Sequence, residues 1–186
     1  MTPHLDTDKQ QHPIGPIIRR LTSVTPAQLA QLAEVLIDCV DGGASVSFMW
    51  PIATDKAQAF WQRVADDVQR GERLLLVAED PAGAIVGTVH LVLALPDNQP
   101  HRADLAKMLV HRRARRQGLG AALVRAAEAA ALAAGKQLLV LDTVTGGDAE
   151  RLYASLGWQR SGEIPGFALW PRGGLCGTTL YFKPLS

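Results

Sequence analysis

The sequence predicts a single α/β (α+β) domain in which helices cover a mixed β-sheet. Short apolar runs typical of strands alternate with longer segments whose apolar residues recur at helical spacing. The expected order is β-α-α-β-β-β-α-β-α-β-β, which favours a sheet layered with helices. The chain has 186 residues, enough for one domain with a substantial core and too few for two ordinary domains.

The N-terminal part is expected to contain a tail, a strand and a helix. Residues 1–15 are polar and have no apolar period, so we expect a disordered tail, with the domain spanning residues 16–186. A short strand is expected at 17–21. Thr25 precedes a proline, which is a typical helix start, and the apolar stripe that follows predicts a helix to about Val40.

A loop, a second helix and a hairpin are expected next. The segment 43–50 follows neither period, and its small, hydroxyl and apolar side chains are typical of a loop that lines a site. Thr54 is expected to cap a helix that Gly71 ends. Apolar runs at 74–79 and 84–94 flank a turn with proline and glycine, which predicts a hairpin.

The second half continues the alternation. The expected elements are a strand at 103–110, a helix at 119–134, a strand at 137–142, a helix at 148–156, and strands at 158–161 and 178–183.

The most informative turn is Arg115-Arg116-Gln117-Gly118-Leu119-Gly120, between a strand and a helix. Such a turn leaves main-chain N–H groups at the helix N-terminus unpaired, where the positive end of the helix dipole can hold a phosphate. Gly118 and Gly120 lack a Cβ, so the backbone can approach a pyrophosphate closely. A solvated basic turn is the alternative interpretation of this segment alone.

Composition and missing motifs exclude several classes of function. The Gly-x-x-x-x-Gly-Lys-Ser/Thr motif of nucleoside triphosphate sites is absent, and Leu123 stands where the dinucleotide fingerprint needs its third glycine. The net charge is +1 with mixed signs, so composition gives no case for nucleic-acid binding.

Cysteine usage and hydropathy indicate the compartment. Cys39 and Cys176 are the only cysteines, and no Cys/His spacing resembles a zinc site, so we expect no metal and no structural disulfide. No apolar run approaches the ~20 residues of a membrane span, and residues 1–15 lack a signal-peptide core. We therefore expect a cytoplasmic protein without membrane association.

Two motifs together resemble the GNAT superfamily of acyl-CoA-dependent N-acetyltransferases over residues 16–184. They are Arg-Arg-Gln-Gly-Leu-Gly at 115–120, after the fourth strand, and Leu-Tyr-Ala-Ser-Leu-Gly-Trp at 152–158. The resemblance implies the GNAT fold, with about seven strands, splayed between strands 4 and 5, and about four helices. It implies acetyl-CoA as cosubstrate, with its pyrophosphate contacted by Arg115, Arg116, Gln117, Gly118, Leu119 and Gly120.

A narrower resemblance concerns the tabtoxin-resistance acetyltransferases. The matching segments are Gly42-Gly43-Ala44-Ser45-Val46-x-Phe48-Met49, Leu141-Asp142-Thr143, Gly162-Glu163-x-Pro165-Gly166 and Tyr181-Phe182-Lys183. This resemblance implies a role in antibiotic or toxin resistance. The acceptor would be the primary amine of a small, amino-acid-like or β-lactam toxin.

The family resemblance also implies roles at the thioester. Main-chain N–H groups of Met108, Leu109 and Val110 would bind along the pantetheine arm and polarise the thioester carbonyl. Tyr153 would donate a proton to the departing thiolate. For each residue an ordinary packing role is the alternative.

Acetylation also needs a group that removes a proton from the amine. Asp104 at the head of the fourth strand and Asp142 at the end of the fifth are the candidate bases, directly or through water. Structural roles for both carboxylates stay open. Glu163 is a candidate for binding a substrate ammonium, and Ser45, Phe48 and Met49 are candidates for lining the acceptor site.

Other readings of the chain remain. A sensor module could bind acyl-CoA without chemistry, and an acetyltransferase with an open groove could act on protein or peptide amines. Exposed strands near the C-terminus leave pairing into a homodimer open.

Overall fold

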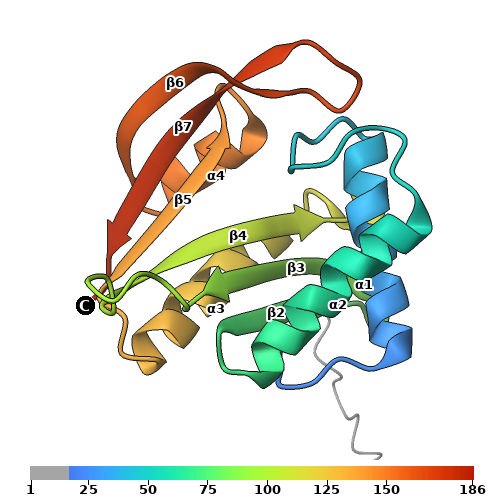
Figure 1. Ribbon diagram of the computed structural model, residues 1–186, viewed down its shortest axis with the longest axis horizontal. Coiled ribbons are helices and arrows are strands. Elements are labelled where there is room, and N and C mark those ends of the chain that lie inside the picture. Colours follow the sequence, from blue (N-terminus) through green and yellow to red (C-terminus); the bar gives the residue numbers. More distant parts are fainter. Residues whose placement is uncertain (1–16) are drawn as a thin grey trace, which may run out of the picture.

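The computed structural model describes residues 17–186, and the tail expected at 1–15 lies outside the described residues. The elements follow the expected order (Figure 1). They are β1 (Ile17–Leu21), α1 (Pro26–Asp41), α2 (Thr54–Gln69), β2 (Arg73–Glu79), β3 (Ile85–Val92), β4 (Arg102–Val110), the 3-10 turn η1 (Arg112–Ala114), α3 (Leu119–Ala133), β5 (Leu138–Val144), α4 (Asp148–Ser155), β6 (Gln159–Leu169) and β7 (Leu175–Pro184).

The strands form one mixed sheet of seven, in the order β1-β2-β3-β4-β5-β7-β6. Every neighbouring pair is antiparallel except β4 and β5, which run parallel. These two strands pair only where Arg102–Asp104 faces Leu138–Val140. Beyond Asp104, β5 and the strands that follow it turn away from β4 (Figure 1). The expected splay between strands 4 and 5 is therefore confirmed.

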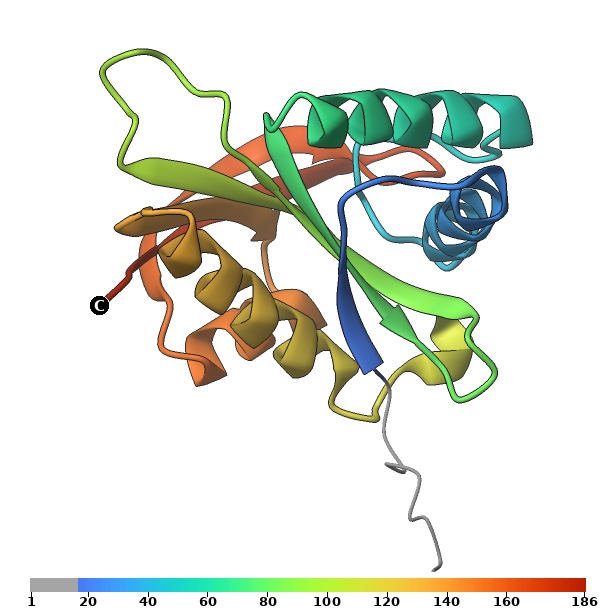
Figure 2. The same cartoon turned by 90° about the horizontal axis from the view of Figure 1, so that it is seen from below.

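The helices cover both faces of the sheet (Figure 2). On one face α3 packs against β2, β3 and β4 with an apolar row that includes Leu123, Val124 and Ala127. On the opposite face α1 and α2 enclose Trp61 together with Leu75 and Val77 of the sheet. Two apolar clusters thus hold β2–β4 rigid from both sides, so β4 offers a fixed edge to the space beyond it.

Local sequence signals explain where the first helices begin. Thr25 accepts a hydrogen bond from the Gln28 N–H at 3.2 Å, and the Gln28 side chain accepts one from the Thr25 N–H at 3.0 Å, completing a capping box. The expected cap of the second helix was wrong by one position. Ala53 is the N-cap of α2, without a side-chain hydrogen bond, and Thr54 is already helical.

The C-terminal strands are much longer than expected. Residues between the two predicted runs, rich in proline and glycine, extend β6 to Leu169 and begin β7 at Leu175. Register shifts between Arg160 and Gly162 and between Ile164 and Ala168 absorb the residues that fit a regular ladder poorly. The result is a long hairpin that reaches beyond the sheet.

Among the helices at 17–186, none is long and apolar enough to cross a membrane.

Candidate active site

A cavity of about 1190 Å³ opens where β4 and β5 part. Its walls come from the unpaired part of β4, the end of β5, the first turn of α3, one side of α4, the loop at 44–49 and the β6–β7 hairpin. A crevice at strand ends, where neighbouring strands diverge, is a favoured place for ligands in α/β sheets.

β4 carries a bulge at the edge of this cavity. Thr88 of β3 pairs with Leu109 and His90 pairs with Ala106, so Lys107 and Met108 together face one residue of β3. Lys107 has a φ of 49°, which is rare for a residue with a side chain. On the β5 side, the described part of β4 beyond Asp104 has no strand partner. Met108, Leu109 and Val110 all line the cavity.

The turn before α3 ends at the same cavity. Gly118 is the N-cap of α3 with a φ of 76°, and it provides no side-chain hydrogen bond to the helix N-terminus. A Cβ on Gly120 would lie 3.0 Å from Leu152 Cδ2, so this glycine lets α3 approach α4. Gly118, Gly120, Arg115, Arg116 and Leu119 line the cavity, whereas Gln117 is not among the lining residues.

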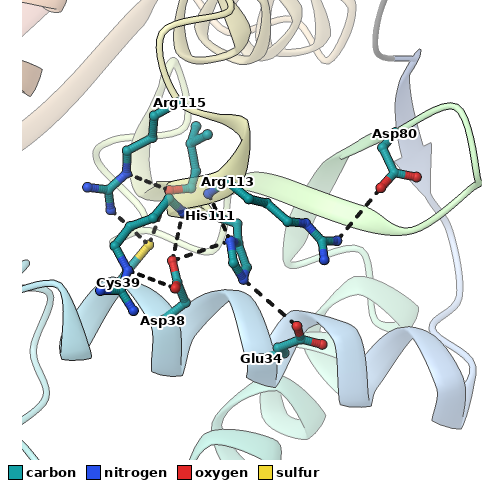
Figure 3. Close-up of polar contacts among 9 residues, drawn as sticks. Glu34, Asp38, Cys39, Asp80, His111, Arg113 and Arg115 are labelled. Carbon is teal, nitrogen blue, oxygen red and sulfur yellow. Dashed lines mark hydrogen bonds and ion pairs between the residues drawn. The ribbon is translucent and has the colours of Figure 1, made fainter.

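Arg113 and Arg115, at the start of the segment that leads from β4 to α3, are bound to the protein itself (Figure 3). Arg115 Nε donates to the Val110 carbonyl at 3.0 Å, and its guanidinium lies 3.8 Å from Cys39 Sγ. Arg113 pairs with Asp80 at 3.7 Å. Burial raises the pKa of the Cys39 thiol, so the thiol stays protonated. These contacts fix the path of the chain from β4 to α3.

Asp38 of α1 anchors the start of the same segment. It accepts hydrogen bonds from the main chain and from Nε of Arg112, both at 2.8 Å. Burial opposes the charged form, but the two hydrogen bonds from Arg112 outweigh it, and the pKa of Asp38 lies below its usual value. Arg112 is therefore engaged with a carboxylate of the protein itself.

Tyr153 brings a phenol to the cavity from α4. Its side chain is buried, and its ring packs 5.6 Å from the Trp158 ring and 6.2 Å from the Tyr181 ring, centroid to centroid. Burial, and then the negative charge of Asp142, raise the pKa of the Tyr153 phenol. The hydroxyl therefore keeps its proton at neutral pH and can act as a proton donor.

Asp142 lies in the cavity and Asp104 does not. The Asp142 carboxylate accepts a hydrogen bond from Thr178 Oγ1 at 3.0 Å, and the same hydroxyl lies 3.0 Å from the Thr143 carbonyl. Asp104 forms an ion pair with Arg102 at the closed end of the splay, away from the lining residues. Of the two candidate bases, only Asp142 can face a molecule in the cavity.

The loop at 44–49 is joined to the β6–β7 hairpin across one side of the cavity. Ser45 Oγ donates to the Leu169 carbonyl at 2.8 Å, and the Trp50 N–H donates to the Pro171 carbonyl at 2.8 Å. Ser45, Phe48 and Met49 line the cavity, whereas Glu163 is outside the lining and pairs with Arg160 at 2.8 Å.

Several lining residues could not be found from the sequence. Phe167, Leu169 and Trp170 belong to the part of the hairpin that looked like a loop, and no sequence signal joins them to the cavity. Lys107 also lines it, and its Nζ donates to Ser47 Oγ at 3.1 Å. Burial lowers the pKa of Lys107, while the charge of Asp142 acts in the opposite direction.

Within residues 17–186, no group of three or more His, Cys, Asp or Glu side chains is placed to hold a metal ion.

Comparison with known proteins gives two findings. The sequence at 37–158 matches the Acetyltransferase (GNAT) family. The fold resembles a GNAT superfamily phosphinothricin acetyltransferase from Sinorhizobium meliloti, solved in complex with acetyl-CoA, with a TM-score of 0.77 and 18% identity over 92% of this chain and 89% of that chain.

Two further solved structures share the fold. A ribosomal-protein-alanine N-acetyltransferase from Brucella melitensis has a TM-score of 0.74 and 22% identity over 91% of this chain and 99% of that chain. The protein yncA from Salmonella typhimurium, solved with its cofactor acetyl-CoA, has a TM-score of 0.72 and 21% identity over 92% of this chain and 95% of that chain. At these identities the likeness concerns the fold.

Proposed function

Because the chain belongs to the GNAT acetyltransferase family, we propose that it transfers the acetyl group of acetyl-CoA to the primary amine of a small molecule by direct attack. One observation carries the proposal. A single cavity joins the glycine turn of α3, the unpaired edge of β4, the phenol of Tyr153 and the carboxylate of Asp142. These are the parts that amine acetylation needs.

The cosubstrate is held in two places. The pyrophosphate lies at the N-terminus of α3, where Gly118 leaves main-chain N–H groups without a side-chain cap. The pantetheine arm runs along the β4 edge at Met108–Val110, whose main-chain groups on that side have no strand partner among the described residues. An N–H group of this edge polarises the thioester carbonyl as negative charge develops on its oxygen.

The proposed reaction is a nucleophilic substitution at the thioester carbonyl carbon. The amine nitrogen forms a bond to the carbonyl carbon, and the bond from that carbon to sulfur breaks. Asp142 takes the proton that the amine loses, directly or through water, and Tyr153 gives its proton to the departing thiolate. Burial, and then the charge of Asp142, raise the pKa of the Tyr153 phenol and keep it protonated until sulfur departs.

The acceptor is proposed to be small and amino-acid-like, such as a β-lactam toxin. The bonds from Ser45 to Leu169 and from Trp50 to Pro171 tie the 44–49 loop to the hairpin, which limits the length of an acceptor on that side. Two similar folds belong to phosphinothricin acetyltransferases by their names. Acetylation of protein or peptide amines needs a longer open groove.

A non-catalytic acyl-CoA sensor is the alternative, and one experiment separates the two. Calorimetry measures acetyl-CoA binding, and a thiol-release assay screens amino acids, β-lactam amino acids, polyamines and aminoglycosides. An enzyme binds acetyl-CoA and releases thiol with at least one amine. Binding without release for every amine identifies a sensor, and no binding contradicts both functions.

A further inference from the structure

Lys107 is a cation inside the cavity that has no anionic partner among the described residues. Its ammonium has three donors, and its one hydrogen bond within residues 17–186 goes to Ser47 Oγ at 3.1 Å. No carboxylate of these residues lies within ion-pair distance of its Nζ. A half-buried ammonium with donors to spare is a binding group for an anion.

The β4 bulge determines where this ammonium lies. With two residues opposite one on β3, Lys107 leaves the regular alternation of the strand and adopts a φ of 49°. A left-handed conformation costs free energy for any residue with a Cβ, and burial of the ammonium adds to that cost. An apolar side chain would fill the same space without a desolvated charge.

An aromatic pair lies beside the ammonium. Lys107 Nζ lies 5.7 Å from the centroid of the Phe60 ring, and Phe60 packs edge-on against Phe48, with 5.3 Å between centroids. These rings keep water from one side of the ammonium, so its attraction to an anion in the cavity is screened less than on an open surface.

Asp142 supplies the complementary charge in the same cavity. Asp142 and Lys107 line the same cavity, yet no ion pair joins them. Burial lowers the pKa of Lys107, and the charge of Asp142 only partly opposes that shift. Tyr153, Asp142 and Lys107 all line this one cavity. A molecule bound in the cavity can therefore meet an anionic group, Asp142, and a cationic group, Lys107.

We propose that Lys107 selects the acceptor by binding its carboxylate while Asp142 faces its amino group. The acceptor class is then an amine that carries a carboxylate within the same small molecule, as an amino acid does. This inference rests on the proposed acetyl transfer and assigns the residue that recognises the acceptor. Amines without an anionic group leave the Lys107 ammonium without a partner, and they bind less well.

Matched acceptors and variants test the assignment. The acceptors are L-amino acids paired with their amides, for example L-methionine with L-methioninamide, because the amide keeps the amine and removes the negative charge. Lys107→Met should lower kcat/KM for the acid about 10- to 100-fold more than for the amide, as expected for one lost charged hydrogen bond. Lys107→Arg should retain part of the preference. Lys136→Met, at a lysine bonded to the Pro100 carbonyl outside the cavity, should behave as wild type.

Binding without turnover separates this inference from the proposed function. Calorimetry measures the binding of L-amino acids to protein saturated with coenzyme A. No reaction follows, because coenzyme A carries no acetyl group. Binding that Lys107→Met weakens, with no thiol release from acetyl-CoA, supports the carboxylate site and contradicts the transferase. If the protein acetylates both acids and amides, and Lys107→Met lowers kcat/KM equally for the two, the carboxylate site is contradicted and the proposed acetyl transfer is not. Failure of every amino acid to bind also contradicts the carboxylate site.

Discussion

Tyr153 and Tyr181 pack with 6.2 Å between ring centroids, but they differ in what their hydroxyls contact. The Tyr181 hydroxyl donates to Glu150 Oε1 at 3.2 Å, outside the cavity lining. Tyr153 lines the cavity, and no hydrogen-bond partner among the described residues contributes to its raised pKa. These are the two tyrosines of the chain, so each serves as the control for the other.

Tyr153→Phe should retain acetyl-CoA binding and lose about 100-fold or more in kcat, because general acids typically contribute that much. Calorimetry measures the binding, and thiol release measures the turnover. Tyr181→Phe removes a hydroxyl that contacts Glu150 outside the cavity lining, and it should keep turnover within about threefold of wild type. Undiminished turnover in Tyr153→Phe rules out the proposed role of the phenol.

Asp142→Asn should lower kcat/KM by about 10- to 100-fold, because the amide can neither accept the amine proton nor bind an ammonium strongly. Asp104→Asn should have little effect, since Asp104 pairs with Arg102 away from the cavity. Kinetics at saturating acetyl-CoA compare the two variants. A larger loss of kcat/KM in Asp104→Asn than in Asp142→Asn would assign the base to Asp104.

Much of the fold could be predicted because local sequence signals determine the type and order of most elements. The Thr25 cap, the glycine turn before α3 and the alternation of apolar runs each give an element its type and order. The extension of β6 and β7 could not be predicted, because pairing between two glycine- and proline-containing segments depends on the partner strand rather than on propensity.

The candidate site was predictable only where residues lie in recognisable segments. Such segments contain Tyr153, Asp142 and the 115–120 turn. All of these except Gln117 line one cavity. Lys107 could not be identified, because a lysine in a strand is ordinarily read as solvent-facing, and the bulge that redirects it has no sequence signal. The ion pairs that occupy Asp104 and Glu163 depend on side-chain geometry that no spacing reveals.

Gly118→Ala should destabilise the protein by about 1 kcal/mol and weaken acetyl-CoA binding, because a φ of 76° disfavours a Cβ and the turn would shift. Gly118→Asn is the matched variant, since asparagine tolerates the left-handed region better than alanine. This variant should lose less stability and less acetyl-CoA affinity than Gly118→Ala. Urea unfolding and calorimetry measure the two effects. Unchanged acetyl-CoA affinity in Gly118→Ala would place the pyrophosphate elsewhere.

His90 should make the protein less stable in acid. Burial, followed by the charges of Arg73 and Lys107, holds the pKa of this 1%-exposed side chain well below its usual value. The unfolded chain takes up the proton near pH ~6.5 and the folded chain does so only at lower pH, so acid favours unfolding between these two values. The free energy of unfolding should fall by up to about 1.4 kcal/mol per pH unit across this window.

Urea unfolding of wild type and His90→Gln from about pH 7.5 to pH 5 isolates this contribution, because the variant lacks the proton-binding group. His90→Gln should show the weaker pH dependence, and His101→Gln, at an exposed histidine, should follow wild type. Equal slopes for wild type and His90→Gln would show that the buried imidazole does not titrate differently on unfolding.

The most direct test of acetyl transfer is a single turnover. Protein loaded with one equivalent of acetyl-CoA is mixed with a panel of amino-acid amines, and the acetylated amine and free coenzyme A are measured by mass spectrometry. We predict one acetylated amine for each coenzyme A released, with product formation lost in Tyr153→Phe on the same timescale. Acetyl-CoA that binds and stays intact with every amine would contradict the account.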